Sequence, residues 1–322
     1  MHVQSVLAWT DGSVAGDSAV DRAAEVAAGA GAALTVAPAP FTRGTLRQRL
    51  LPRLARRVRQ LARQYGVPFP PPAPGPASWS EARAMAAAAD LVVLPAPWRS
   101  GWSRLWRPGL LDRLLRHTDS PLLVVRQPSS LAWGRATAAV DLSSRSSLLL
   151  AFAAGLRTGA RFELLHVLPE APPRRARSGS GSGSGVATTD FAIRRPLLAR
   201  APASAAATGL EHLVSLAQAS GLPARPLLVH GRRGGPGGAR EAILERQQES
   251  QARLLMLGHA RRPSVGGAVL GSIASAVAHR AACDVLVVPD AWLDRWAGVA
   301  APVATAASEG FAPSRAAMAA GR

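Results

Sequence analysis

Two features of the sequence could bind a charged ligand: an aspartate after a short apolar run, and a glycine-rich segment near the end of the chain. The run at 136–140 ends in Asp141, and Gly258–Ser272 reads GHARRPSVGGAVLGS. A carboxylate accepts hydrogen bonds from a ribose hydroxyl or an adenine amine. Free N–H groups at a helix start, joined here by the Ser272 hydroxyl, favour a phosphate. Together these residue types indicate a nucleotide site.

The elements that must position these residues are strands and helices in alternation. Short apolar runs without polar alternation, typical of strands buried on both faces, occupy 136–140, 162–167, 225–229, 253–257 and 284–288. Stretches of helical period lie between them at 146–155, 210–219, 239–251 and 272–280. This order predicts a parallel sheet with helices on both sides, in which ligands bind beyond the carboxyl ends of the strands at the switch point. Asp141 and the glycine-rich segment would then meet in one crevice.

The first half of the chain repeats this pattern. Asp11 ends an apolar run 130 positions before Asp141, and the predicted strands of this half are 3–9, 33–37, 91–94 and 122–125. A fifth slot falls at 66–77, where prolines allow only a short edge strand or none. We therefore predict an α/β fold of two tandem doubly wound domains, each a mainly parallel five-stranded sheet with helices on both faces (Rossmann-like).

Composition shifts suggest the domain limits. We expect domains at 1–128 and 132–291, a flexible Ser/Gly-rich insert at about 171–207, and a poorly ordered Ala-rich tail at 292–322 that begins as a short helix at most. A basic amphipathic helix is predicted at Arg53–Gln64, with Leu54, Val58 and Leu61 on one face.

These motifs resemble those of the universal stress protein family, with two such domains in one chain from Val3 to Pro289 outside the insert. The nucleotide-binding form of that family carries G-x2-G-x9-G-[S/T] after its fourth strand and an aspartate after its first. Gly258, Gly271 and Ser272 fit that spacing, and Asp141 fits the aspartate. The resemblance implies ATP binding, with or without Mg²⁺, in a nucleotide-responsive protein of stress adaptation. The implied nucleotide-binding residues are Asp141, His166, Val167, Gly258, Arg261, Gly271, Ser272 and Ile273.

The sequence departs from the family motif at Arg261, where a glycine is expected. The guanidinium could reach a phosphate, close the loop by its bulk, or point to solvent. The first-half loop departs further, because prolines replace motif residues at Pro95 and Pro108 and proline offers no N–H. We expect that first site to be degenerate, with the tryptophans of its loop filling the crevice or packing against the other domain: Trp98, Trp102 and Trp106.

Other signals are weaker. The net charge is +18 and all 38 basic residues are arginine, a bias that a GC-rich genome produces without a functional cause. The first alternative to nucleotide binding is therefore a scaffold protein of the same fold that binds no nucleotide. Nucleic-acid binding through arginine clusters at 53–63 and 174–177 is the weaker alternative. Three histidines at strand ends are expected to shape the pocket rather than hold a metal: His166, His230 and His259.

The remaining expectations concern chemistry and setting. We expect no catalytic constellation and hence no enzyme, and an inert buried Cys283. The chain lacks an apolar run long enough to span a bilayer and starts without a secretory signal, so we expect a cytoplasmic protein. The expected partners are an adenine nucleotide and, within the chain, the other domain; further homodimerisation stays open.

Overall fold

The structure, a computed structural model, describes residues 3–40, 42, 44–96, 109–168, 203–231, 237–260 and 272–297; of these, the side chains of 203, 204, 237 and 272 are not described. Its strands are β1 (Ser5–Thr10), β2 (Ala33–Pro38), β3 (Leu91–Pro95), β4 (Leu122–Val125), β5 (Arg135–Ala139), β6 (Arg161–Leu168), β7 (Ala224–His230), β8 (Leu254–His259) and β9 (Asp284–Pro289). Its helices are α1 (Val14–Ala30), α2 (Gly44–Tyr65), α3 (Trp79–Ala87), α4 (Leu110–His117), α5 (Ser144–Gly155), α6 (Ala203–Ser220), α7 (Gly237–Ser250) and α8 (Ser272–Arg280), followed by a helix at 290–297.

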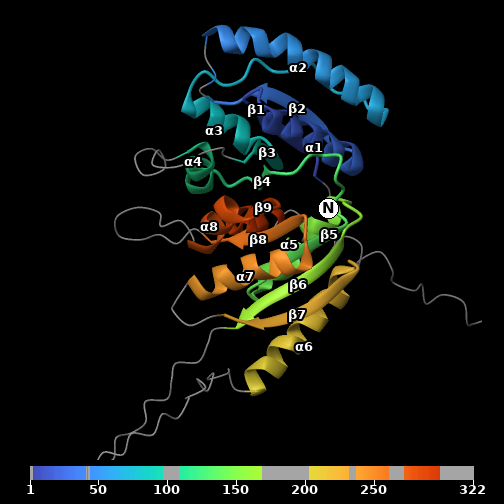
Figure 1. Ribbon diagram of the computed structural model, residues 1–322, viewed down its shortest axis with the longest axis vertical. Helices are drawn as coiled ribbons and strands as arrows, with labels where there is room; N and C mark the ends of the chain where they lie inside the picture. The colour runs from blue at the N-terminus through green and yellow to red at the C-terminus, as the bar shows by residue number, and fades with distance from the viewer. Residues whose placement is uncertain are drawn as a thin grey trace, which may run out of the picture.

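All nine strands form one sheet that runs the length of the molecule, in the order β2-β1-β3-β4-β9-β8-β5-β6-β7 (Figure 1). Every neighbouring pair is parallel except β4 and β9, which are antiparallel. The α/β fold predicted from the strand–helix alternation is confirmed. The two halves do not keep separate sheets, however, because their last strands pair and extend one sheet across both.

Within its described residues, the first half contributes four strands to the sheet rather than five. Residues 67–76, in the proline-rich segment, form no strand, and the segment reaches β2 through a hydrogen bond from the Ala73 N–H to the Val36 carbonyl at 2.8 Å. Prolines have no N–H to donate to a ladder, so a continuous pairing with β2 cannot form there. β2 is consequently one edge of the sheet, and β7 is the other.

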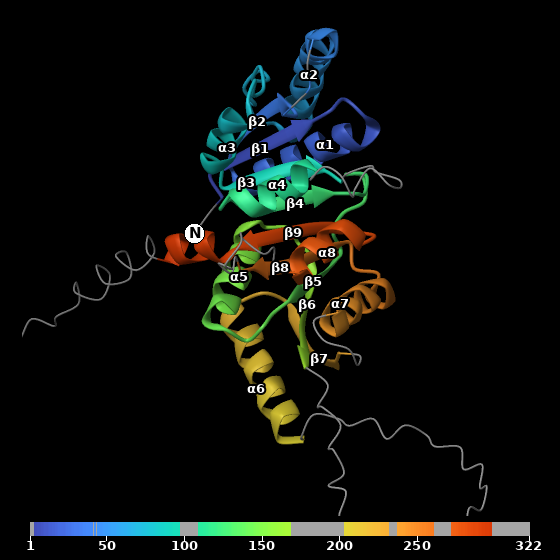
Figure 2. The same cartoon turned by 90° about the vertical axis from the view of Figure 1, so that its left-hand side faces the viewer.

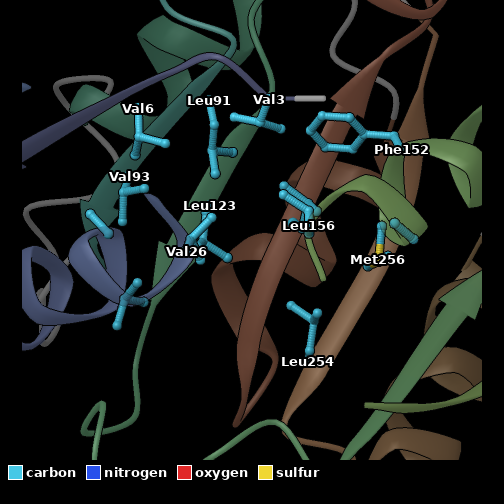
Figure 3. Packing of buried hydrophobic residues seen from close by; sticks show 14 of the residues in the cluster. Val3, Val6, Val26, Leu91, Val93, Leu123, Phe152, Leu156, Leu254 and Met256 are labelled. Atoms are coloured by element: carbon cyan, nitrogen blue, oxygen red, sulfur yellow. The ribbon is translucent and has the colours of Figure 1, made fainter. Parts of the chain in front are cut away.

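Helices cover both faces of the sheet (Figure 2). On one face α1, α2, α5 and α6 bury a continuous apolar layer, part of which Figure 3 shows, with Val26 and Leu123 from the first half and Phe152 and Met256 from the second. On the other face α3, α4, α7 and α8 bury a second layer. The α2 prediction is confirmed in its buried stripe, although the helix is longer than 53–64. Among the described residues, no helix is long and apolar enough to cross a membrane.

A buried ionic cluster fastens the two halves where β4 meets β9. The Asp284 carboxylate accepts hydrogen bonds from the Trp133 indole N–H at 2.7 Å and from the backbone N–H groups of Arg126 and Gln127 at 2.7 and 3.0 Å. Arg22 of α1 lies 3.4 Å from the same carboxylate, and its guanidinium also lies 4.7 Å from the Trp133 ring centre. Both charged side chains are fully buried. This buried polar cluster therefore joins the first half, the connecting segment and β9 within an apolar layer.

Candidate functional site

The carboxyl ends of β5, β6, β8 and β9 lie on the same side of the molecule, because these strands are mutually parallel. Asp141 lies two residues beyond the end of β5, and continuing the register places it level with Val167 on β6 and His259 on β8. Gly258 lies in β8, and α8 begins at Ser272. The topology thus brings Asp141, the end of β6 and Gly258 to one edge, the place where open α/β sheets bind ligands.

Asp141 is held in a tight turn before α5. Its Oδ1 accepts a hydrogen bond from the Ser143 N–H at 3.0 Å and another from the Ser146 hydroxyl at 3.1 Å, while Leu142 adopts φ 62°. Partial burial acts to raise the pKa of Asp141, but the hydrogen bonds from Ser143 and Ser146 outweigh it and lower the pKa below its usual value. The carboxylate is therefore charged and oriented before any ligand arrives.

The first half builds the same turn around Asp11. The Asp11 carboxylate accepts hydrogen bonds from the Ser13 N–H at 3.0 Å and its hydroxyl at 2.6 Å, and Gly12 has φ 80°. The aspartate turn is thus present in both halves. The glycine motif is present only in the second half, because Pro95, at the end of β3, occupies the position that corresponds to Gly258 in β8. The rest of that first-half loop, including its three tryptophans and Pro108, lies outside the described residues.

His166 and Val167 lie near the end of β6, as the resemblance implied. The Nδ1 atom of His166 is 2.8 Å from the Val140 carbonyl oxygen, and because a carbonyl can only accept, Nδ1 carries the proton. The Nε2 atom is left to form a hydrogen bond with a ligand. Val167 is half-buried and packs against the layer under α7 and α8. A histidine oriented through its Nδ1 and an apolar wall suit the edge of an adenine ring better than a phosphate.

His259 does not line the crevice in the way expected. It is 2% exposed, and its Nε2 is 3.3 Å from the Leu115 carbonyl at the end of α4 in the first half. Burial lowers its pKa, so the ring is neutral at neutral pH. The physical reason is the antiparallel β4–β9 junction, which brings α4 against the second half. Within the described part of the chain, no three metal-binding side chains lie close enough together to hold an ion.

An ionic group that the sequence motifs did not predict lies at the same carboxyl ends of the strands. Arg145, in the first turn of α5, lies 3.3 Å from Asp290 and makes two hydrogen bonds of 2.9 Å to Asp294. A Cβ built on Gly258 would lie 3.7 Å from an Asp290 oxygen, so Asp290 borders the same strand end. Burial raises the pKa of Asp290, while Arg145 acts against this. The sequence signal was Asp290 itself, directly after the last strand, as Asp141 follows the first.

The other predicted site residues are placed only in part. Ile273 is half-buried and packs with the α7–α8 layer. Ser272 starts α8, but its side chain lies outside the described part, as do Arg261 and Gly271. The glycine motif is thus seen at its two ends, Gly258 and the start of α8.

The fold defines a class of protein: a Rossmann-like, doubly wound α/β protein with a mostly parallel sheet. Residues 133–289 match the model of the universal stress protein family, a match that covers just under half of the chain. A comparison with curated proteins found no match.

Three solved structures are similar to this chain. A universal stress protein from Archaeoglobus fulgidus DSM 4304 is 16% identical, with 90% of this chain and 99% of that chain covered and a TM-score of 0.57. A functionally unknown protein from Pseudomonas aeruginosa PAO1 is 16% identical, with 93% and 98% covered and a TM-score of 0.59. Identities this low show a shared fold alone. A universal stress protein from Archaeoglobus fulgidus in complex with dAMP covers 49% of this chain and 99% of its own, at 21% identity and a TM-score of 0.29, too low to bear on this site.

Proposed function

We propose that the second half of this chain binds an adenine nucleotide, ATP in the first instance, and that the protein acts as a nucleotide-responsive stress protein rather than an enzyme. The observation that carries the proposal is the Asp141 carboxylate, charged and oriented at the carboxyl edge of the sheet beside Gly258 and His166. The family match over 133–289 supports it.

Five of the predicted residues have a direct role in this proposal. The Asp141 carboxylate accepts from the ribose, and His166 with Val167 borders the base. The start of α8, with Gly271 and Ser272, receives the phosphates through free N–H groups. Asp290 and Asp294 outnumber Arg145 at this edge, so a polyphosphate would meet excess negative charge. We therefore propose that the nucleotide binds as its Mg²⁺ complex.

The test is a calorimetric titration with ATP and Mg²⁺, after mass spectrometry has excluded carried-over nucleotide. We expect one site per chain. Asp141→Asn should weaken binding about 10- to 100-fold, the effect of losing one hydrogen bond to a charged group. Asp11→Asn is the matched control, because Asp11 occupies the same kind of turn in the first half, and it should leave the affinity unchanged.

Two further variants separate the outcomes. Gly271→Trp should abolish binding if the start of α8 receives the phosphates. Unchanged affinity in both Asp141→Asn and Gly271→Trp would place the pocket elsewhere. Two sites per chain would mean that the Asp11 edge also functions, despite Pro95.

A scaffold protein that binds no nucleotide is the second candidate. The observation that favours it is Arg145, the cation nearest to Asp141 in sequence at this edge, which two carboxylates already neutralise. Absence of binding in the wild type, with no co-purified nucleotide, would support this candidate. Arg261→Gly, which restores the family motif, would then be expected to recover binding if the arginine blocks the loop.

A further inference from the structure

A groove lies at the amino-terminal ends of the strands of the second half, opposite to the ends that carry Asp141. It is bounded by the amino-terminal ends of β5, β6 and β7 and by the end of α7, and its volume is about 700 Å³. That volume is within the range of small-molecule sites in proteins. The proposed nucleotide crevice lies at the carboxyl ends of the same strands, so the groove is a separate feature.

The strand register gathers arginines in this groove. Arg135 on β5 lies beside Arg161 on β6, and two residues further along the same face Arg225 on β7 lies beside Glu163. The side chains of Arg161 and Arg225 are exposed and make no hydrogen bond or ion pair with any residue that the structure describes. Guanidinium groups without a carboxylate partner are suited to bind phosphate or carboxylate oxygens in pairs of hydrogen bonds.

The groove carries an excess of positive charge. Its four arginines face two glutamates. Both glutamates are paired with Arg246, which lies 2.7 Å from Glu163 and 3.2 Å from Glu249. Arg135 donates a hydrogen bond to the Ser250 carbonyl at 3.2 Å, a neutral acceptor. Three guanidiniums therefore have no carboxylate among the groove residues, enough for a ligand with two or more negative charges.

A buried hydroxyl supports the same conclusion. Thr137 lines the groove and is 0% exposed, and its Oγ1 has no hydrogen-bond partner in the described structure. Its neighbours on the same sheet face are Glu163 and Leu255. Buried hydroxyl groups nearly always have a partner, because leaving one unmet costs free energy. An anionic ligand that reaches Thr137 beside the intact Arg246–Glu163 pair would give this hydroxyl an acceptor.

We propose that this groove is an oxyanion site that binds the phosphate or carboxylate groups of a small metabolite. Among the described residues that line it, Phe162 is the only aromatic one and is 3% exposed, so these residues offer no ring on which a nucleic-acid base could stack. The site does not depend on nucleotide binding at the other edge.

The test uses pyrophosphate and citrate as separate probes in calorimetry on the full chain at low ionic strength. We expect one site per chain for at least one of them; pyrophosphate alone would assign a phosphate ligand, and citrate alone a carboxylate ligand. Arg161→Gln with Arg225→Gln should weaken binding about tenfold or more, because two charge-assisted contacts are lost. Arg56→Gln with Arg59→Gln, which removes two exposed arginines from α2, is the control for net charge and should change affinity less than twofold.

Two results would overturn the proposal: no binding of either probe, or equal weakening by the two charge-removing pairs. Asp141→Asn should leave probe binding intact, so failure of the nucleotide proposal would be seen separately. Thr137→Val should weaken binding severalfold with an unchanged unfolding temperature; an unchanged affinity would contradict the role of the buried hydroxyl.

Discussion

At the residue scale, Cys283 shows how position decides reactivity. It directly precedes β9, beside the ionic cluster around Asp284, and its side chain is fully buried. Burial raises the pKa of its thiol to about 12. Because the thiolate is the reactive form, almost none is present at neutral pH.

We therefore predict that Cys283 does not react with a thiol reagent such as DTNB in the native protein at pH 8. In guanidinium chloride the thiol should react fully, since unfolding restores its ordinary pKa and its access. The measurement is the absorbance of the released thiolate over an hour in each condition. Rapid native reaction would show that β9 opens locally.

At the element scale, the helix at 290–297 shows why the end of the second half is ordered. The tail was expected to begin as a short helix at most. The Trp292 ring of this helix lies 4.8 Å from Phe152 of α5 in an edge contact and 5.2 Å from Trp296 in a stacked one. The two tryptophans are four residues apart, a spacing that puts them on one helix face. The rest of the tail, 298–322, lies outside the described residues.

We predict that Trp292→Ala lowers the free energy of unfolding by about 3–5 kcal/mol, the usual cost of truncating a buried aromatic side chain. Trp296→Ala should cost less, because Trp296 is only half-buried. Urea denaturation followed by circular dichroism measures both. If neither substitution lowered the free energy of unfolding, the helix at 290–297 would not stabilise the domain.

At the scale of the whole molecule, the two halves are joined by the β4–β9 pairing and by the buried Arg22–Asp284 cluster. A buried ion pair adds little over an apolar pair, but removing one partner weakens the charge compensation of the other. Without Asp284, the buried Arg22 would keep one carboxylate partner, the partly exposed Glu25 at 2.5 Å. Asp284 also accepts hydrogen bonds from three N–H groups, and its loss would leave these donors without an acceptor.

Asp284→Ala should therefore destabilise the protein by about 3–5 kcal/mol. The control is Arg295→Gln, which breaks the exposed Arg295–Asp119 pair between the same halves and should cost about 0–1 kcal/mol. Thermal unfolding measures both, and a double variant with Arg22→Met should cost less than the sum of its single changes. Equal effects of Asp284→Ala and Arg295→Gln would argue against the cluster as the fastening point.

The sequence by itself determined the local elements and the aspartate turns. Apolar runs and helical periods depend on neighbouring residues, so β4 and α8 fall where the pattern placed them. Asp11 and Asp141 could be matched by their offset alone. The sequence also predicted that the segment at 66–77 forms no full strand, because each proline lacks the N–H that a strand donates and this is a local property.

Only the tertiary structure decided which elements became neighbours. The antiparallel β4–β9 junction merged two expected sheets into one and turned His259 toward Leu115. The groove of Arg135, Arg161 and Arg225 likewise assembles residues from three strands separated by long crossovers. Lateral register between distant strands leaves no periodic trace in the sequence, since it is set by packing of the helices and by strand order rather than by adjacent residues.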